Sequence, residues 1–247
     1  MARIFITGSA DGLGKLAAKE LVNQGHQVVL HARQKDRAKD AWSSVPGAEA
    51  VLIADLSDME ETKRLAAEAN ALGTFDAVIH NAGVYQASGK AIFAVNTLAP
   101  YLLTCLINKP RRLIYLGSDM HLSGDPELKQ SVFEKGSVSY SDSKLHVLLL
   151  TMAVARKWPD VYANAVDPGW VPTKMGGAGA PDNLEKGFQT QAWLAASKED
   201  QVKVSGRYFY HKREARYLSE AGDVVLQEQF LELCEQITGV HFPEDRH

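Results

Sequence analysis

The 247-residue chain is 45% hydrophobic and 23% charged, with a formal net charge of −3 and two cysteines. A disordered chain would contain fewer apolar residues, and a collagen-like or disulfide-rich chain would show a glycine period or dense cysteine. The slight acidic excess gives no basic surface for nucleic acid or an anionic membrane. No linker-like stretch divides the chain, so we expect a single α/β domain over residues 1–247.

Cysteine placement and the apolar stretches indicate the cellular setting. Cys105 and Cys234 lie far apart in apolar segments, which favours two buried reduced thiols over a disulfide. Residues 1–8 enter a strand that breaks at a glycine, which leaves no room for the apolar core of a signal peptide. The longest apolar-rich stretch, 147–155, is far shorter than the roughly 20 residues of a membrane span. We therefore expect a cytoplasmic protein without a membrane span.

Short β-branched runs alternate with segments of helical period, the pattern of β–α–β units in a parallel sheet. The predicted strands are 3–7, 27–31, 50–54, 77–80, 113–117, 162–166 and 207–210. The predicted helices are 13–24, 35–43, 58–71, 91–107, 139–157, 184–196 and 223–238. Right-handed crossovers then place helices on both faces of a doubly wound parallel sheet of about seven strands. Ligands of such sheets bind beyond the carboxyl ends of the strands.

A glycine-rich turn, residues 7–14, joins the first strand to the first helix. Its glycines allow a tight turn and a close approach of the backbone to a ligand. A pyrophosphate would lie on the free N–H groups at the helix N-terminus, where the helix dipole favours negative charge. A turn without a ligand is the alternative, and the position at the first strand–helix junction favours a nucleotide. The candidate contacts are Gly8, Ser9, Asp11, Gly12, Leu13 and Gly14, of which Asp11 adds an unfavourable negative charge.

The end of the second strand indicates which nucleotide binds. A carboxylate there would hold the ribose hydroxyls of NAD, whereas this chain has the cations Arg33, Lys35 and Arg37. Arg33 can direct two donors to a 2′-phosphate. The pattern therefore favours NADP over NAD. The alternative is that these three cations only solvate the start of a helix.

Tyr140 and Lys144 stand four residues apart near the start of a predicted helix. This spacing places the phenol and the ammonium on one helical face. A lysine charge about 5 Å away, at an effective dielectric of about 20, favours the phenolate by about 3 kcal/mol, or about two pKa units. We therefore expect a lowered pKa that suits Tyr140 to acid–base work. An ordinary surface pair is the alternative.

These residues belong to a longer series placed at strand ends and on helices. In chain order it comprises the 7–14 turn, Asp55, Asn81, Ala82, Gly83, Asn96, Ser118, Tyr140, Lys144, Pro168 and Gly169. From residue 3 to about residue 175, the series resembles the short-chain dehydrogenase/reductase family. The resemblance implies a Rossmann-type fold and an NAD(P)-dependent oxidoreductase.

The resemblance also implies roles for individual residues. Ser118 would hold the substrate oxygen, Tyr140 would exchange the proton and Asn96 would support a water in the proton relay. Lys144 would bind the nicotinamide ribose and lower the pKa of Tyr140. Further implied cofactor contacts are Asp55 and Leu56 at the adenine, Asn81, Ala82 and Gly83 at the cofactor side of the sheet, and Pro168, Gly169, Val171 and Thr173 at the nicotinamide.

Three of these residues have structural alternatives. Ser118 could be a buried capping serine. Asn96, a poor helix former, could mark a helix kink satisfied by its own side chain. Asp55 could cap the helix that starts near Ser57. The resemblance further implies a homodimer or homotetramer through the helices of Ile92 and Tyr140, and a monomer stays open.

Two loops depart from the common family pattern. The interval between Ser118 and Tyr140 is longer than in many members, and we expect its extra residues at the substrate mouth. This loop is similar to the retinol-dehydrogenase-like branch of the family. His121 is expected at the pocket edge rather than as a third acid–base group. The glycine-rich stretch 174–181 is interpreted as a lid over the substrate or as an ordinary surface loop.

The last part of the chain carries fewer motifs. Residues 207–210 are expected to form an edge strand. The cations that follow are expected to form a solvated charge run, namely Lys212, Arg213 and Arg216.

Together, the motifs predict an NADP(H)-dependent oxidoreductase that interconverts a carbonyl and an alcohol on a small molecule. A non-catalytic NADP(H)-binding sensor or scaffold would have lost Ser118, Tyr140 or Lys144, and all three are present. A methyltransferase would carry an acid near Arg33, and a sugar-nucleotide epimerase would be longer. No metal is expected, because the eight histidines are scattered without ligand spacing. The motifs do not specify the substrate.

Overall fold

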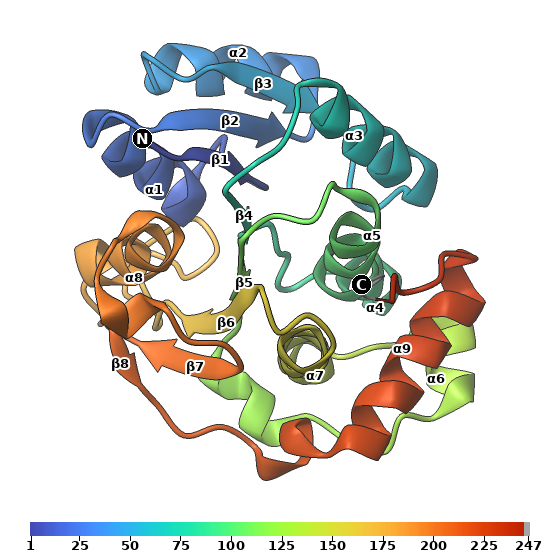
Figure 1. Ribbon diagram of the computed structural model, residues 1–247. Coiled ribbons are helices and arrows are strands. Elements are labelled where there is room, and N and C mark those ends of the chain that lie inside the picture. The colour runs from blue at the N-terminus through green and yellow to red at the C-terminus, as the bar shows by residue number, and fades with distance from the viewer. Residues whose placement is uncertain (245–247) are drawn as a thin grey trace.

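The computed structural model describes residues 1–244 and places one eight-stranded sheet at its centre (Figure 1). Its strands are β1 (Arg3–Ile6), β2 (Gln27–Ala32), β3 (Ala50–Ile53), β4 (Ala77–His80), β5 (Arg112–Leu116), β6 (Tyr162–Asp167), β7 (Arg207–Tyr210) and β8 (Arg213–Glu214). They lie in the order β3-β2-β1-β4-β5-β6-β7-β8, and only β7 and β8 pair antiparallel. The order reverses between β1 and β4, the point at which doubly wound sheets bind ligands.

Helices cover both faces of the sheet, as the alternating pattern predicts (Figure 1). One face carries α1 (Gly12–Asn23), α2 (Lys35–Ser44) and α8 (Leu184–Ala196). The other face carries α3 (Met59–Ala71), α5 (Ala99–Leu106) and α7 (Tyr140–Lys157). Outside α7 lie α9 (Val224–Thr238) and the short α6 (Gln130–Lys135). The fold is thus the expected doubly wound α/β architecture.

Alternation along the strands explains why the sheet is buried on both sides. In β1, Ile4 and Ile6 join the apolar cluster under α1 and α8, whereas Phe5 joins the cluster on the opposite face. All three side chains are fully buried. Because neither face meets water, the strands appear in the sequence as continuous apolar runs.

The predicted helix 91–107 is divided into three parts. α4 (Gly89–Ile92) leads into a π-helical segment, Phe93–Leu98, which continues as α5. Asn96 lies in this wide turn, and its amide bonds to the main chain of Val84 on another segment. The alternative of a kink satisfied by the Asn96 side chain within its own helix is therefore wrong. π-helical turns are frequent at functional sites.

Within residues 1–244, this same stretch, Gly89–Leu106, is long and apolar enough to cross a membrane by length and composition alone. It exceeds the 147–155 run that we had expected to be the longest apolar one. Its surroundings account for its composition, since 61% of it is buried, with α5 against α3 and the π-helical segment against α7. The core helix of a soluble protein has the same character.

β7 is not the edge strand that the sequence indicates. Arg213 and Glu214 pair with it as β8, with Tyr210 opposite Arg213 and Phe209 opposite Glu214. The sheet therefore has eight strands rather than about seven, and the expected charge run is partly a strand. Two residues carry too little apolar alternation to reveal a strand in the sequence.

The long interval between β5 and α7 is also more ordered than a loop. It contains a 3₁₀ turn, Asp119–Ser123, and α6. From α6, Phe133 lies with its ring 5.2 Å from that of Phe93 and 6.5 Å from that of Phe230 in α9. Part of this interval thus supports the packing of α9 instead of forming a substrate mouth.

α9 covers the helix that the resemblance assigns to an oligomer interface. Residues 143–154 of α7 are all buried, and α9 packs along this helix. Farther along the chain, the Trp158 indole donates to the carbonyl of Pro243 at 3.0 Å. The outer face of α7 is therefore occupied by the chain itself. The oligomeric state stays a prediction.

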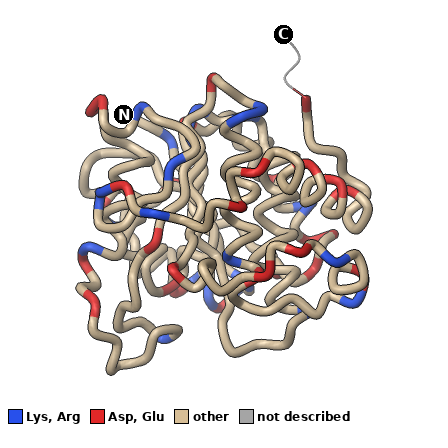
Figure 2. Tube along the Cα trace, turned by 90° about the horizontal axis from the view of Figure 1, so that it is seen from below, with Lys and Arg blue, Asp and Glu red and all other residues tan. Residues whose placement is uncertain are grey.

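The surface charges and the cysteines agree with the composition. In the view of Figure 2, basic and acidic positions are intermixed along the trace, as a near-neutral net charge predicts. Cys105 and Cys234 are free thiols, so the preference for reduced cysteines is confirmed. Burial raises the pKa of Cys105 to about 12 and that of Cys234 well above its usual value.

Candidate active site

A cleft of about 470 Å³ runs along the carboxyl edge of the sheet and gathers most of the predicted site residues. Those lining it are Gly8, Asp11, Gly12, Leu13, Arg33, Asp55, Leu56, Asn81, Ala82, Gly83, Tyr140, Lys144, Pro168 and Thr173. The predicted residues that do not line it are Ser9, Gly14, Asn96, Ser118, Gly169 and Val171. Loops after several strands thus bring together residues that are far apart in the sequence.

The glycine turn forms a cradle whose shape depends on missing side chains. Gly8 has a φ of 64°, and a Cβ there would lie 2.8 Å from the Cα of Ala82. A Cβ at Gly14 would lie 2.3 Å from the amide nitrogen of Asn81. At Gly12, a Cβ would meet nothing closer than Thr173, at 3.9 Å, so this part of the turn is open. The first N–H groups of α1 have no acceptor within the helix, and that of Gly12 donates to the capping Asp11 carboxylate at 2.8 Å. An N-terminus of this kind is a general anion-binding position, which suits a pyrophosphate.

Asn81 and Thr7 join the turn to the end of β4. The Asn81 amide donates to the carbonyls of Thr7 and Gly8 at 3.0 and 3.1 Å. The Thr7 hydroxyl accepts from the N–H of Ala82 at 3.1 Å. These bonds brace the turn against the end of β4, at the side of the sheet where the resemblance implies the cofactor. Thr7 is a supporting residue that the sequence reasoning missed.

His31 at the end of β2 is a second supporting residue that we had not singled out. Its Nδ1 accepts from the N–H of Gly8 at 2.9 Å, and its Nε2 donates to the carbonyl of Ala54 at 3.0 Å. Burial lowers the pKa of His31 to about 4, so the ring is neutral and can accept at Nδ1. The Ser9 hydroxyl accepts from the N–H of His31 at 2.9 Å. Ser9 is fully buried and braces the turn from below.

Arg33 forms an ion pair with Asp55 across two strand ends. The Arg33 Nε lies 2.8 Å from the Asp55 carboxylate, and the Arg33 side chain is 72% exposed. Although burial acts in the opposite direction, hydrogen bonds from Ser57 and Arg33 lower the pKa of Asp55. The residue that caps α3 is Asp58, so the alternative of Asp55 as the cap of this helix is wrong.

Two cations neutralise the negative charge of Asp11 in the glycine turn. Its Oδ2 lies 2.6 Å from the Lys174 amine and 2.9 Å from the Arg37 guanidinium. The hydrogen bond from Lys174 has the largest effect on the pKa of Asp11 and holds it well below its usual range. The N–H of Gly12 and the Arg37 guanidinium act in the same direction. Arg37 and Lys174 both line the cleft. The unbalanced carboxylate in the turn was the signal that could have pointed to them.

Tyr140 and Lys144 lie in the first turns of α7, which Ser139 begins with a capping box. The Lys144 amine lies 5.3 Å from the centroid of the Tyr140 ring and donates to the carbonyl of Leu116 at 2.8 Å. Lys144 is 5% exposed, and burial lowers its pKa to about 8. The pair is therefore built into the cleft wall and is not an ordinary surface pair.

The expected lowering of the Tyr140 pKa is wrong. Burial of the phenol raises its pKa, and the nearby groups Asp167, Tyr85 and Asp119 act in the same direction. The Tyr85 ring contacts that of Tyr140 edge-on, with centroids 4.8 Å apart. The Lys144 charge lies over the ring face, and it does not offset the burial. Tyr140 therefore keeps its proton at neutral pH, as a proton donor must.

Ser118 caps the 3₁₀ turn that follows β5. Its hydroxyl accepts from the N–H of Met120 and donates to Asp119, both at 3.2 Å. The residue is half-exposed and follows Gly117, which lines the cleft. Ser118 therefore does cap a turn, as the structural alternative proposes, but it is not the buried serine of that alternative.

Asn96 is buried and lies against α7. Its amide donates to the Ser143 hydroxyl at 3.1 Å. A Cβ at Gly83 would lie 3.5 Å from the Asn96 Oδ1 and 3.8 Å from the Lys144 amine. Asn96 and Lys144 therefore approach the same stretch of backbone at the end of β4, where a Cβ on Gly83 would be in ordinary van der Waals contact with both.

His121 does not lie at the pocket edge, and that expectation is wrong. The residue is fully buried, and burial lowers its pKa. Its Nδ1 donates to the carbonyl of Ser118 at 2.6 Å, and its Nε2 accepts from the N–H of Leu218 at 3.2 Å. His121 therefore ties the loop after β5 to the segment before α9.

The segment after β6 crosses toward the glycine turn. The main-chain N–H of Trp170 donates to Asp182 at 2.6 Å, and its indole donates to the carbonyl of Gly176 at 2.8 Å. Lys174 then connects the segment to Asp11. Whether it acts as a lid stays a prediction. Within residues 1–244, no group of three or more His, Cys, Asp or Glu could hold a metal ion.

Comparison with known proteins identifies the family. A model of the short chain dehydrogenases matches residues 2–107. Uncharacterized oxidoreductase AN7799 of Emericella nidulans is 47% identical, over 98% of this chain and 99% of its own. The chain belongs to the short-chain dehydrogenase/reductase family. Short-chain dehydrogenase chyC of Penicillium rubens is 43% identical over 98% of this chain and 100% of its own. Human retinol dehydrogenase 14 is 28% identical over 96% of this chain and 86% of its own. This similarity agrees with the resemblance to the retinol-dehydrogenase-like branch.

Solved structures show the same fold. An uncharacterized protein from Mycobacterium paratuberculosis has a TM-score of 0.81 at 22% identity, covering 98% of this chain and 95% of its own. A blue fluorescent protein from a metagenomic library, in complex with NADPH, has a TM-score of 0.69 at 20% identity, covering 84% of this chain and 95% of its own. A short chain dehydrogenase from Shigella flexneri, complexed with NADP, has a TM-score of 0.67 at 20% identity, covering 86% of this chain and 97% of its own. Family membership makes this chain a dehydrogenase/reductase with a nicotinamide cofactor.

Proposed function

We propose that the protein is an NADP(H)-dependent oxidoreductase that interconverts a carbonyl and an alcohol on a small molecule. Its catalytic residues would be Asn96, Ser118, Tyr140 and Lys144. The observation that carries this proposal is one cleft that contains both the Tyr140–Lys144 pair and the glycine turn. The order of these residues along the chain is that of the family.

The cleft fits a dinucleotide along its length. The glycine turn would hold the pyrophosphate, and Asp55 would lie at the adenine. Arg33, with Arg37 beside it, would hold a 2′-phosphate, which supports NADP over NAD. The NADP(H) complexes of two proteins with this fold support the same choice. When bound, the nicotinamide supplies or accepts the hydride.

The protein groups would handle the proton and the developing charge. Tyr140 would donate its proton to the substrate oxygen, since burial keeps the phenol protonated. Ser118 would donate a hydrogen bond to the same oxygen, where negative charge develops. Lys144 would stabilise the phenolate that remains, and Asn96 would support a water that returns the proton. This arrangement favours carbonyl reduction over alcohol oxidation at neutral pH.

A panel of carbonyls and alcohols, followed at the NADPH absorbance band and repeated with NADH, tests the proposal. We expect reduction of at least one carbonyl, with kcat/KM about tenfold or more higher for NADPH than for NADH. Tight NADPH binding without turnover of any carbonyl would instead favour a non-catalytic sensor. We also propose a cytoplasmic location, which the two free cysteines support.

A further inference from the structure

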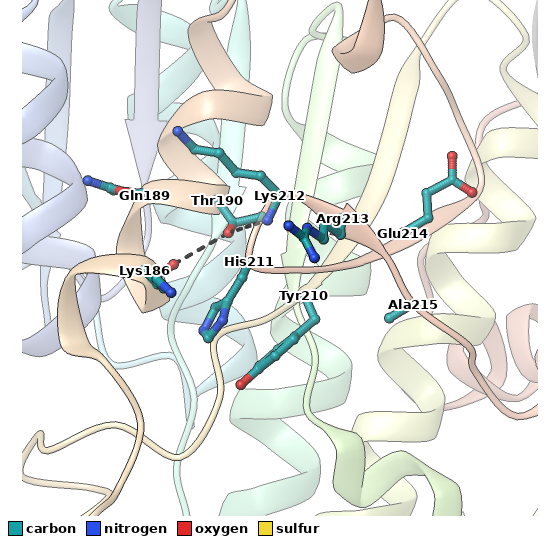
Figure 3. Close-up of a pocket in the computed structure, with 9 residues that line it drawn as sticks. All are labelled: Lys186, Gln189, Thr190, Tyr210, His211, Lys212, Arg213, Glu214 and Ala215. Atoms are coloured by element: carbon teal, nitrogen blue, oxygen red, sulfur yellow. Dashed lines mark hydrogen bonds between the residues drawn. The ribbon is translucent and has the colours of Figure 1, made fainter.

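A second hollow lies at the hairpin formed by β7 and β8 (Figure 3). This hairpin pocket has a volume of about 590 Å³ and is lined by Lys186, Gln189 and Thr190 of α8 and by residues 210–215. It shares no lining residue with the cleft. It lies at the carboxyl end of β7, where Tyr210 pairs in register with Asp167 of β6. Ligands of α/β sheets bind at this edge.

The hairpin pocket carries an excess of positive charge. Four lining side chains are basic, namely Lys186, His211, Lys212 and Arg213, and one is acidic, namely Glu214. In the part of the chain that the structure describes, no ion pair neutralises Lys186, Lys212 or Arg213. The acidic Glu214 pairs with Arg207, which does not line the pocket, at 3.9 Å. Like charges around one hollow repel each other unless an anion lies between them.

The turn of the hairpin is strained. His211 and Lys212 form a two-residue turn between Tyr210 and Arg213, and their φ values are 48° and 62°. Such turns strongly prefer Asn-Gly, because both positions need the left-handed region. A histidine and a lysine in these places cost stability, and strain of this kind concentrates at functional sites.

The strained turn is held in position, and one of its polar atoms lacks a partner. The N–H of Lys212 donates to the Thr190 hydroxyl at 3.1 Å, which fixes the turn against α8 (Figure 3). The His211 ring stacks on Tyr210, with centroids 3.8 Å apart. The His211 Nε2 is shielded from solvent and has no hydrogen-bond partner among residues 1–244. A shielded nitrogen without a partner is costly, and a ligand would remove that cost.

We propose that the hairpin pocket binds an anionic group of the carboxylate or phosphate kind. The Arg213 guanidinium can hold two oxygens of such a group, and Lys186 and Lys212 supply further charge. His211 would donate from its Nε2. The anionic group belongs either to the substrate or to a separate small anion. The first case rests on the proposed function.

Titration with inorganic phosphate tests the binding itself. Isothermal titration is performed on protein saturated with NADP⁺, so that phosphate does not report on the cleft. We expect Arg213→Gln and Lys212→Gln each to weaken phosphate affinity about fivefold or more. Lys198→Gln changes the net charge equally just after α8 and lies outside the pocket, so it should leave the affinity unchanged. Phosphate binding that is absent in the wild type, or equal in all variants, overturns the proposal.

Binding at the hairpin pocket does not depend on the cofactor assignment. In protein without nucleotide, Arg213→Gln and Lys212→Gln should still weaken phosphate binding relative to the wild type, and Lys198→Gln should still leave it unchanged. If the protein reduced no carbonyl, the proposed function would fail, while the phosphate titration would still decide the hairpin pocket.

Two aldehydes distinguish the source of the anionic group. Benzaldehyde and 4-carboxybenzaldehyde differ by one carboxylate. If the substrate carries the group, Arg213→Gln should lower kcat/KM for 4-carboxybenzaldehyde about fivefold or more and leave benzaldehyde unchanged. If both aldehydes respond alike while phosphate binding is lost, the ligand is a separate anion.

Replacing the turn by its preferred residues separates binding from a structural role. The double variant His211→Asn with Lys212→Gly removes the strain, and we expect its Tm to rise by about 3 °C. Its phosphate affinity should fall about tenfold or more, since the Lys212 charge and the His211 ring are both lost from the pocket. A rise in Tm with unchanged phosphate affinity, or a fall in Tm, would overturn the proposal.

Discussion

Two regions at the carboxyl edge of the sheet gather cations, and they differ in what surrounds those cations. In the cleft, Arg33 pairs with Asp55, and Asp11 pairs with both Arg37 and Lys174. In the hairpin pocket, within residues 1–244, no carboxylate pairs with the lysines or with Arg213. Both regions hold more cations than carboxylates, but three of the cleft cations, Arg33, Arg37 and Lys174, are paired within the cleft, and those of the hairpin pocket are not.

The difference indicates what each region is built to do. A paired guanidinium is already oriented, so less side-chain freedom is lost when a phosphate binds. Unpaired cations keep a positive potential that attracts an anion, and they cost stability while the pocket is empty of one. If both proposals hold, the cleft is suited to accurate placement of a nucleotide, and the hairpin pocket is suited to recognition of charge.

Tyr140→Phe should give the largest effect and should affect the cleft alone. Removing the proton donor is expected to lower kcat about 10³-fold, because general acid catalysis contributes about 10²- to 10⁴-fold. NADPH affinity and phosphate binding at the hairpin pocket should be retained. Stopped-flow or steady-state rates, with NADPH fluorescence for binding, provide the measurement. Near-normal turnover in this variant would refute the mechanism.

The pH dependence of reduction should be set by Lys144. Because burial lowers its pKa to about 8, the amine loses its charge as the pH rises through that value. Tyr140 keeps its proton over this range, since its own pKa is raised. We expect kcat/KM for reduction to fall above about pH 8, and Lys144→Met to lose about 10²-fold in rate together with this decline. The same decline persisting in Lys144→Met would assign it to another group.

Local patterns were enough to predict seven of the eight strands of the described residues, the longer helices and most of the cleft. The glycine spacing at 7–14 and the four-residue spacing of Tyr140 and Lys144 are properties of neighbouring residues, so they can be recognised without a fold. The ion pair between Arg33 and Asp55 could not be predicted, because it requires two strand ends to meet. The same applies to the pair between Asp11 and Lys174, which are far apart in the chain.

The errors at Tyr140 and His121 have a common physical origin in burial. The sequence showed the Lys144 charge beside Tyr140, but it did not show that the phenol would be buried near Asp167. It showed His121 in a loop, but not the N–H of Leu218 that the ring accepts. Each error concerns a side chain whose environment is formed by a distant part of the chain.

Arg33→Ala should produce an intermediate effect that tests the value of a paired cation. We expect NADPH affinity to fall about tenfold or more and NADH affinity to change little, since only NADPH carries the 2′-phosphate. Lys35→Ala is the matched control, because this cation belongs to the same basic run and does not line the cleft. Equal and small losses of NADPH affinity in both variants would instead favour the alternative that these cations only solvate the start of the helix. Fluorescence titration with each nucleotide measures the effect.

Asp11→Asn should have the smallest effect, and it makes the cleft cations resemble those of the hairpin pocket. Asparagine can still cap α1, so the change mainly removes the charge shared by Arg37 and Lys174. Because the Asp11 side chain is 35% exposed, solvent screens these pairs, and the free energy of unfolding should fall by about 1 kcal/mol or less. The sign of the pH effect follows from the pKa of Asp11, which is lower in the folded state than in the unfolded state. The ionised carboxylate therefore stabilises the fold above the pKa of the unfolded chain, about 4, and this stabilisation is lost as the pH falls below it. Urea denaturation should therefore show a larger difference between Asp11→Asn and wild type at neutral pH than in acid. A difference that grew on acidification would mean that the carboxylate destabilises the turn, and the cleft cations would then not be held by their pairing.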